Sequence, residues 1–139
     1  MYAAEAEGLR ALRAAGARAP EPHSHGLRGG EAYLEMERLA LGAAPDWPAM
    51  GRMLAELHRN TAPRFGWEND NWIGLSPQKN AWRDDWRAFF IDFRLRPQLE
   101  SARGNGYRIE IGEVAEILAR HAPQASLLHG DLWSGNAGF

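Results

Sequence analysis

Stretches with apolar residues at helical spacing, separated by breaks rich in glycine and proline, most constrain what this chain can fold into. The strongest stripe predicts a long helix over residues 81–98. Pro97 lies near its predicted end and should bend or shorten it. Aromatic side chains in such a stripe are more often core than a platform for a ligand. We therefore expect part of the buried core here, formed by Trp82, Trp86, Phe89, Phe90 and Phe93.

Weaker stripes of the same period predict three further helices, over residues 1–15, 47–59 and 111–121. Gly16 is a typical C-terminal stop for the first helix. Asp46 stands where an N-cap aspartate would precede a first turn that contains proline. These patterns predict a mostly helical chain.

Residues 19–39 are the part of the chain with strand character. Pro20 and Pro22 exclude a helix there, because proline removes a backbone donor and favours extended backbone. Glycines at 29 and 30 supply a turn, and the apolar residues of 31–39 are typical of a strand. The sequence therefore predicts a β-hairpin and an α+β fold class.

The segment 61–80 is rich in Gly, Pro, Asn and Asp, yet it contains four large apolar side chains, Phe65, Trp67, Trp72 and Ile73. A loop of this length inside a domain is usually functional or disordered. Disordered tracts rarely contain so many aromatic residues. We interpret the segment as an ordered loop that could contact a substrate, with a purely structural connector as the alternative.

Composition excludes several classes of function. At 139 residues and 45% hydrophobic content, the chain is the size of one domain with enough apolar side chains for a core. A net charge of −2 argues against nucleic acid as the main partner. No run approaches the roughly 18 apolar residues of a membrane span, and there is no cysteine. We expect a cytoplasmic protein with no nucleic-acid and no membrane partner.

The stretch Ser126–Phe139 carries the clearest chemical motif. Leu127 and Leu128 form an apolar pair that runs into His129, and Asp131 and Asn136 follow. The order HxDLxxxN is that of the catalytic loop of kinase-like phosphotransferases. An apolar strand would lead into the loop, where Asp131 could accept the proton of an attacking hydroxyl. Asn136 could place its side-chain oxygen on a magnesium ion.

Two other interpretations of this motif were weighed. Asp131 and Asn136 could be turn residues that bond their own backbone, as Asp and Asn near Gly often do. Alternatively, His129 and Asp131 could belong to a facial triad that binds non-haem iron. The triad needs a second histidine after this pair, and none follows in the chain. The kinase-like interpretation is favoured over both.

Five stretches of the chain carry a family resemblance. They are YLEMERL (33–39), MLAELH (53–58), IGLSPQKN (73–80), WRDDWRAFFIDFRL (82–95) and HGDLWSGN (129–136). Together they resemble the fructosamine kinases, also called ketosamine 3-kinases, and their order matches that family. The family is a branch of the protein-kinase-like superfamily that includes aminoglycoside phosphotransferases and choline kinases, and HGDLWSGN is specific to this branch.

The resemblance implies a partial protein-kinase-like fold of the α+β class. Residues 1–40 would be the end of the small lobe, with a helix, a hairpin remnant and the hinge. Residues 41–139 would be the first part of the helical large lobe, including a strand that leads into the catalytic loop. The implied cofactors are ATP and Mg²⁺, and the implied substrate is a glycated amine or glycated protein.

The resemblance also implies roles for individual residues. Asp131 would orient and deprotonate the sugar hydroxyl, Asn136 would bind magnesium, and Glu5 would pair with the lysine that anchors ATP. The hinge that bonds adenine would consist of Glu37, Arg38 and Leu39. Side chains that could touch the sugar are Trp133, Asn71 and Gln78.

The implied reaction is ATP-dependent phosphorylation of fructosamine or ribulosamine at the C3 hydroxyl, in protein deglycation. The chain lacks the family's glycine-rich loop and lysine strand before Glu5, and the second metal-binding aspartate after the catalytic loop. We therefore expect a fragment that is inactive alone, and that dimerises or aggregates through uncovered apolar faces. The alternatives are an aminoglycoside or amino-alcohol phosphotransferase of the same fold, and a non-catalytic pseudokinase remnant.

Overall fold

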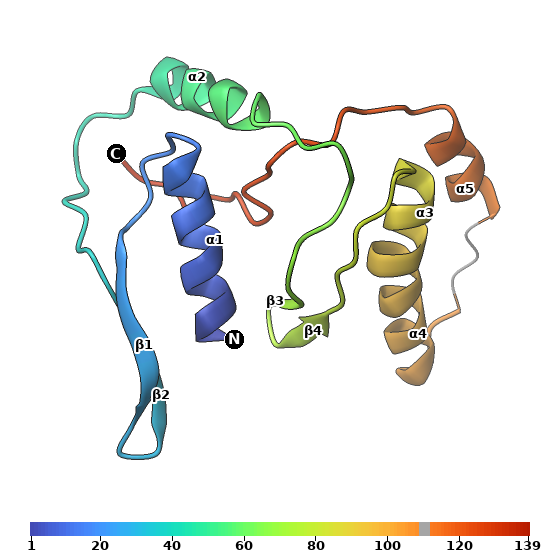
Figure 1. Cartoon of the computed structure of the whole chain (residues 1–139), viewed down its shortest axis with the longest axis horizontal. Coiled ribbons are helices and arrows are strands. Elements are labelled where there is room, and N and C mark those ends of the chain that lie inside the picture. The colour runs from blue at the N-terminus through green and yellow to red at the C-terminus, as the bar shows by residue number, and fades with distance from the viewer. Residues whose placement is uncertain (109–111) are drawn as a thin grey trace. The chain divides into compact units, whose positions relative to one another are not determined.

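The computed structural model describes residues 1–108 and 112–139 (Figure 1). These residues form two units. The first unit joins Met1–Thr61 to Ser126–Phe139, and the second is Ala62–Ala125. The predicted lobes follow a different division of the chain and stay a prediction.

In the first unit, helix α1 (Tyr2–Ala14) lies alongside a hairpin of β1 (Pro22–Arg28) and β2 (Glu31–Met36) (Figure 1). The strands pair antiparallel, with a bulge near the start of β1. The predicted hairpin is therefore confirmed, although β2 ends before the predicted residue 39. Beyond Met36, Glu37 N–H still bonds the Glu21 carbonyl, but Glu21 N–H bonds the Glu37 carboxylate and not its carbonyl, so the regular ladder stops.

Helix α2 (Trp47–His58) begins as its sequence predicts. The side chain of Asp46 accepts a hydrogen bond from the backbone N–H of Ala49 at 2.8 Å, and a proline lies in the first turn. The apolar face of α2 supplies Leu57, which is only 1% exposed. Trp47, the first residue of α2, is 64% exposed and meets the ring of Phe139 edge-on.

The core of the first unit is small. It consists of Leu12 from α1, Ala19 and Leu57, with Leu54 and Leu127 packed against it. Three segments that are distant in sequence therefore meet at one apolar contact. Leu127 comes from the stretch just before the predicted catalytic loop, so this contact anchors the loop.

The strand expected before the catalytic loop is reduced to a single bridge, between Thr61 and Ser126. Two backbone hydrogen bonds make this bridge, from Leu127 N–H to the carbonyl of Asn60 at 2.9 Å and from Ala62 N–H to the carbonyl of Ala125 at 3.0 Å. The ladder does not continue toward α2, because the N–H groups of Arg59 and Asn60 bond carbonyls of that helix.

In the second unit, the segment 61–80 is ordered, as predicted. It contains a short antiparallel hairpin of β3 (Asn71–Ile73) and β4 (Ser76–Gln78). Gly66 has a φ of +141°, a conformation that side chains other than glycine rarely adopt, where the chain turns toward Ala81.

The helix predicted over 81–98 both begins and ends later than expected. Helix α3 (Trp86–Phe90) has Asp85 as its N-cap, and the Asp85 side chain accepts a hydrogen bond from Ala88 N–H at 2.7 Å. The residues before it are extended because Phe65 and Arg83 exchange two backbone hydrogen bonds of 2.8 Å. Trp82, predicted on this helix, therefore lies outside it.

Pro97 does not end this helical run. A π-helical turn, η1 (Ile91–Leu95), follows α3 and leads into α4 (Arg96–Gly104), which holds Pro97 in its first turn. The wider turn accommodates the missing donor and the bulk of the proline ring. The last helix, α5 (Gly112–Ala119), agrees with the prediction, whereas Ile111, its predicted start, lies outside the described residues.

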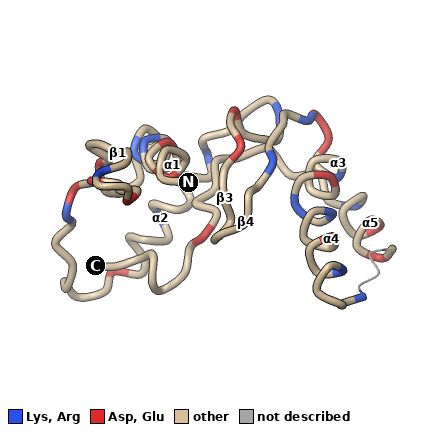
Figure 2. Tube along the Cα trace, turned by 90° about the horizontal axis from the view of Figure 1, so that it is seen from below, with Lys and Arg blue, Asp and Glu red and all other residues tan. Residues whose placement is uncertain are grey.

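Four residues of the predicted aromatic stripe contact one another in the second unit, and one of them, Phe89, is buried; the four are Trp86, Phe89, Phe90 and Phe93. Phe65 contacts Trp86 at 5.4 Å between ring centroids, and Phe89 contacts Phe93 at 6.0 Å. Figure 2 shows that acidic and basic residues are mixed in both units. Within the described part of the chain, no helix has both the length and the apolar character needed to cross a bilayer.

Candidate functional site

The residues of the HGDLWSGN motif form a loop in which Asp131 and Asn136 are in direct contact. The side-chain Nδ2 of Asn136 donates to Asp131 Oδ2 at 2.8 Å and to the Asp131 carbonyl at 3.0 Å. Both side chains are exposed. The predicted proton acceptor and the predicted metal ligand are therefore neighbours in space.

This contact fixes the direction of the Asn136 amide. An ionised carboxylate can only accept hydrogen bonds, so the NH₂ group must be the side that faces Asp131. The Asn136 Oδ1 then points away from Asp131. Neither this oxygen nor Asp131 Oδ1 is hydrogen-bonded within the part of the chain that the structure describes. The Asn136 oxygen could therefore meet a cation, and the Asp131 oxygen could accept a proton.

Backbone features around these residues give the loop its shape. Gly130 has a φ of +84°, so it turns the chain just before Asp131. The N–H of Asn136 bonds to the carbonyl of Trp133 at 2.9 Å and closes a turn. Gly135 lies against the ring of Trp133, where a Cβ would collide with the indole. Trp133 itself is 60% exposed.

The loop is attached to the first unit at both ends. Leu127 packs against the core beside Leu57. At the other end, the Phe139 carbonyl accepts hydrogen bonds from the N–H groups of Gly42 and Ala43, and its ring contacts Trp47 at 4.9 Å. These attachments hold Asp131 and Asn136 on the α2 side of the unit.

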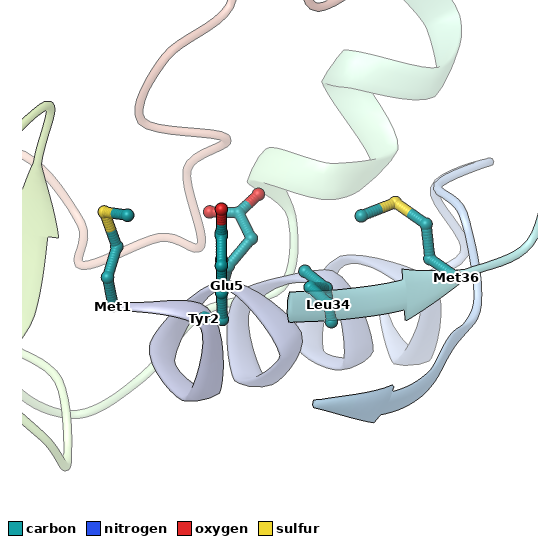
Figure 3. Close-up of a pocket in the computed structure, with 5 residues that line it drawn as sticks. All are labelled: Met1, Tyr2, Glu5, Leu34 and Met36. Carbon is teal, nitrogen blue, oxygen red and sulfur yellow. The ribbon is translucent and has the colours of Figure 1, made fainter. Parts of the chain in front are cut away.

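Glu5 lies over a pocket of about 430 Å³ between α1 and β2. Figure 3 shows its carboxylate projecting to the same side as the other four lining side chains, which are Met1, Tyr2, Leu34 and Met36. The carboxylate of Glu5 makes no hydrogen bond and no ion pair with any described residue, whereas its backbone N–H bonds the Met1 carbonyl. An exposed carboxylate at the rim of an apolar pocket can accept a cationic side chain or ligand.

Glu37, the first residue of the predicted hinge, is already hydrogen-bonded to residues that are distant in sequence. The Glu37 N–H donates to the carbonyl of Glu21 at 2.8 Å, and its carboxylate accepts from Glu21 N–H at 3.2 Å. Arg13 Nη1 also donates to the Glu37 carboxylate at 3.3 Å. Among the described residues, nothing bonds the backbone groups of Arg38 and Leu39. Those groups remain available to a ligand.

Asn71 and Gln78, the two predicted sugar contacts on the loop, face each other across the β3–β4 hairpin. Gln78 Nε2 donates to Asn71 Oδ1 at 2.8 Å, and Asn80 Nδ2 donates to the same oxygen at 3.0 Å. Arg94 Nη2 in turn donates to Asn80 Oδ1 at 2.6 Å. The Asn71 oxygen is therefore fully used, while its NH₂ group and the Gln78 oxygen can still bond a hydroxyl.

Two charged groups around this hairpin have shifted pKa values. The Lys79 ammonium, which bonds the Asp70 carboxylate at 2.6 Å, lowers the pKa of Asp70, and a hydrogen bond from Asn80 N–H adds to this effect. Burial lowers the pKa of Arg94, whose guanidinium lies 4.6 Å from the ring centroid of Phe89. Arg94 stays charged because its ordinary pKa is far above neutrality.

The donors available for a magnesium ion are few in this chain. No group of three or more His, Cys, Asp or Glu side chains suitable for a metal occurs in residues 1–108 and 112–139. Magnesium usually keeps several waters and binds phosphate oxygens as well as one or two protein oxygens. The Asn136 amide oxygen fits a contributing ligand of that kind, and the described residues provide no complete protein cage.

Arg13, Asn80 and Arg94 are the residues near these sites that sequence reasoning missed. Each acts across 14 or more positions, since Arg13 reaches Glu37 and Arg94 reaches Asn80. A helical or strand period does not reveal such pairs. The only available signal was their charge or amide group, which surface residues also carry.

Comparison with known proteins completes this description. A family model described as fructosamine kinase matches residues 1–139. The chain belongs to the fructosamine kinase family. The family resemblance inferred from the five stretches above is confirmed.

Curated relatives from distant organisms support the membership in the fructosamine kinase family. The chain is 42% identical to a probable ketoamine kinase of Synechocystis sp., over 98% of this chain and 49% of that protein. It is 38% identical to the chloroplastic protein-ribulosamine 3-kinase of Arabidopsis thaliana, over 100% of this chain and 47% of that protein. The chain thus spans about half the length of these relatives.

Solved structures support the fold. A crystal structure assigned as a fructosamine-3-kinase from Haemophilus somnus matches all of this chain and 50% of its own, with a TM-score of 0.84 and 27% identity. A second, from Thermobifida fusca, matches with a TM-score of 0.82 and 28% identity, over 51% of its length. The predicted α+β, protein-kinase-like fold is therefore confirmed.

Proposed function

We propose that this protein takes part in ATP-dependent phosphorylation of a ketosamine, fructosamine or ribulosamine, at its C3 hydroxyl. The observation that carries the proposal is the contact between Asn136 Nδ2 and Asp131 Oδ2, in a loop whose sequence is HGDLWSGN. It is supported by a family match over the whole chain and by relatives that are named for ketoamine and ribulosamine kinase activity.

In this proposal, Asp131 receives the proton of the attacking hydroxyl on Oδ1, the oxygen that Asn136 does not occupy. Asn136 keeps the carboxylate oriented through Nδ2 and presents Oδ1 to the cation. Bound magnesium would neutralise charge on the phosphate oxygens of ATP. Glu5 would hold a lysine that positions the nucleotide, and the backbone of residues 37–39 would bond adenine.

The acceptor contacts in the proposal are Trp133, Asn71 and Gln78. Trp133 offers an exposed ring two residues from Asp131, and sugars pack well on such faces. The free NH₂ group of Asn71 and the free oxygen of Gln78 form a donor and acceptor pair, which suits a hydroxyl that both donates and accepts. Cytoplasmic location stays part of the proposal.

The test uses a chimera in which this chain replaces the matched half of the Synechocystis ketoamine kinase. We expect magnesium-dependent ADP release when fructosamine or ribulosamine is added, and phosphate on C3 by NMR of the product. Cooperative melting of the chimera would show that it folds. A folded chimera whose turnover does not exceed that of its Asp131→Asn variant would refute the proposal.

Parallel assays separate the proposal from its nearest alternatives. Aminoglycosides and amino alcohols should be poor acceptors for the same chimera, and a preference for either would move the function to another kinase class. The isolated chain should release no ADP, because phosphoryl transfer needs the lysine and the second metal ligand. Turnover by the isolated chain would contradict that expectation.

A further inference from the structure

Arg13 joins three segments of the first unit that are separate in sequence. Its guanidinium donates to the carbonyl of Ala19 at 2.6 Å, to the carboxylate of Glu37 at 3.3 Å and to that of Glu21 at 3.4 Å. Arg13 itself lies in the last turn of α1. One side chain therefore ties the end of α1 to the segment before β1 and to the segment after β2.

A solvated arginine near a helix C-terminus would be the ordinary arrangement, because cations favour that end of the helix dipole. Arg13 differs from it in having three acceptors in fixed positions, which suits the rigid fork of a guanidinium. Both of its ion pairs are partly exposed, and such pairs contribute little to stability. We therefore expect the contacts of Arg13 to fix the relative positions of these three segments, and to add little to the free energy of unfolding.

The segment that Arg13 holds is the start of the proposed hinge. Glu37 is bonded on three sides, through its N–H to Glu21, through its carboxylate to Glu21 N–H, and through the same carboxylate to Arg13. The next two residues, Arg38 and Leu39, keep unbonded backbone groups within the described part of the chain. A planar ring that carries one hydrogen-bond donor and one acceptor would bind these unbonded backbone groups.

Glu5 lies on the same helix as Arg13, two turns nearer the N-terminus. Since a helix transmits displacement along its axis as a rigid element, the Arg13 contacts also set where Glu5 stands relative to residues 37–39. We infer that Arg13 is a positioning residue that fixes the nucleotide hinge relative to the helix of Glu5. The inference rests on the proposed function, because the hinge role of these residues is part of it.

The experiment uses the chimera described above and two readouts, backbone hydrogen exchange and the binding of ADP by calorimetry, with and without Mg²⁺. In Arg13→Met, we expect the amides of Glu21 and Glu37 to exchange about threefold faster or more. We expect ADP to bind about fivefold more weakly or worse, equally with and without the metal, because the change acts on the adenine side.

Matched variants separate positioning from loss of charge or of fold. Arg10 is an exposed arginine of the same helix whose side chain makes no hydrogen bond or ion pair with any described residue, so Arg10→Met should change neither readout. Arg13→Lys should recover part of the ADP affinity, since it keeps the charge but cannot reach three acceptors. All binding is measured well below the melting temperature of each variant.

Each outcome decides the inference. Faster exchange together with weaker ADP binding supports it. Faster exchange with unchanged ADP affinity would make Arg13 a purely structural contact and overturn it, as would unchanged exchange. If the chimera with unaltered Arg13 binds no ADP while exchange still responds to Arg13→Met, the proposed nucleotide role fails and the contacts of Arg13 stand without it.

Discussion

Asn136 donates its side-chain amide to the carboxylate of Asp131, with Nδ2 and Oδ2 2.8 Å apart. The two residues are five positions apart, and the turn closed by Asn136 N–H and Trp133 carbonyl brings them together. An amide held in this way cannot rotate freely, so its oxygen has one direction in which to meet a cation. A change to either side chain therefore removes the contact that orients the other.

Removal of the Asp131 carboxylate should therefore abolish turnover while it leaves the loop folded. In the chimera, Asp131→Asn should lower kcat by about 10²- to 10⁴-fold, the usual contribution of a positioned proton acceptor. Asp84→Asn is the control, since Asp84 is an exposed aspartate whose partner is Arg64. A loss of kcat below tenfold for Asp131→Asn, or an equal loss for the control, would contradict the assigned role.

The contact of Asp70 with Lys79 predicts a response to acid. Lys79 holds the pKa of Asp70 below its ordinary value of 3.8, so the folded state binds this proton less readily than the unfolded state. The stabilisation is complete above pH 3.8 and is lost as the pH falls below it, through the lower folded pKa. NMR titration of the Asp70 carboxyl in Lys79→Met should return the pKa toward 3.8; an unchanged titration would contradict this cause.

Arg94 should stabilise the second unit more than its other arginines do. Arg94→Met leaves Asn80 Oδ1 and the Lys79 carbonyl without their donor and removes the guanidinium from the ring of Phe89. We expect the free energy of unfolding to fall by about 1–3 kcal/mol, measured by urea denaturation.

The matched control for Arg94 is Arg87→Met. Arg87 is exposed on the same helical run, and its side chain bonds no described residue, so its loss should cost less than about 0.5 kcal/mol. Equal losses of unfolding free energy for the two variants would show that the Arg94 contacts do not stabilise the second unit.

Two glycines should respond in opposite directions to alanine. Gly66 has a φ of +141°, and a Cβ there would lie 3.0 Å from Trp82 Cα, so Gly66→Ala should destabilise by about 1–3 kcal/mol. Gly8 lies inside α1 with no atom within 4 Å of a Cβ, so Gly8→Ala should stabilise by about 0.5–1 kcal/mol. Urea denaturation of both variants checks the signs.

The exposed apolar side chains predict self-association of the isolated chain. Leu75 is 87% exposed at the tip of the β3–β4 hairpin, and Leu27 is 76% exposed at the tip of the β1–β2 hairpin. Large exposed apolar surface favours association. We expect sizing with light scattering to show dimers or larger species. A sharp monomer peak with cooperative melting would refute this.

Part of the fold followed from local patterns. The caps at Asp46 and the aromatic stripe at Trp86 and Phe89 act within one or two turns of helix, so a fixed period reveals them. The predicted start at residue 81 was wrong even though Asp85 stands in the sequence as a cap. The long-range backbone pairing of Arg83 with Phe65 keeps the residues before α3 extended in spite of the aromatic stripe, and no local sequence pattern predicts that pairing.

The candidate site likewise has some features that the sequence predicts and others that only the tertiary structure sets. The sequence by itself determined which residues could do the chemistry, because Asp131 and Asn136 stand at the spacing of a known loop. Only the tertiary structure decided how they are oriented and supported, as in the amide direction of Asn136 and the contacts of Arg13 with Glu37. The reason is physical: periodic burial and capping depend on neighbours in sequence, whereas the direction of a polar side chain depends on acceptors that distant segments bring to it.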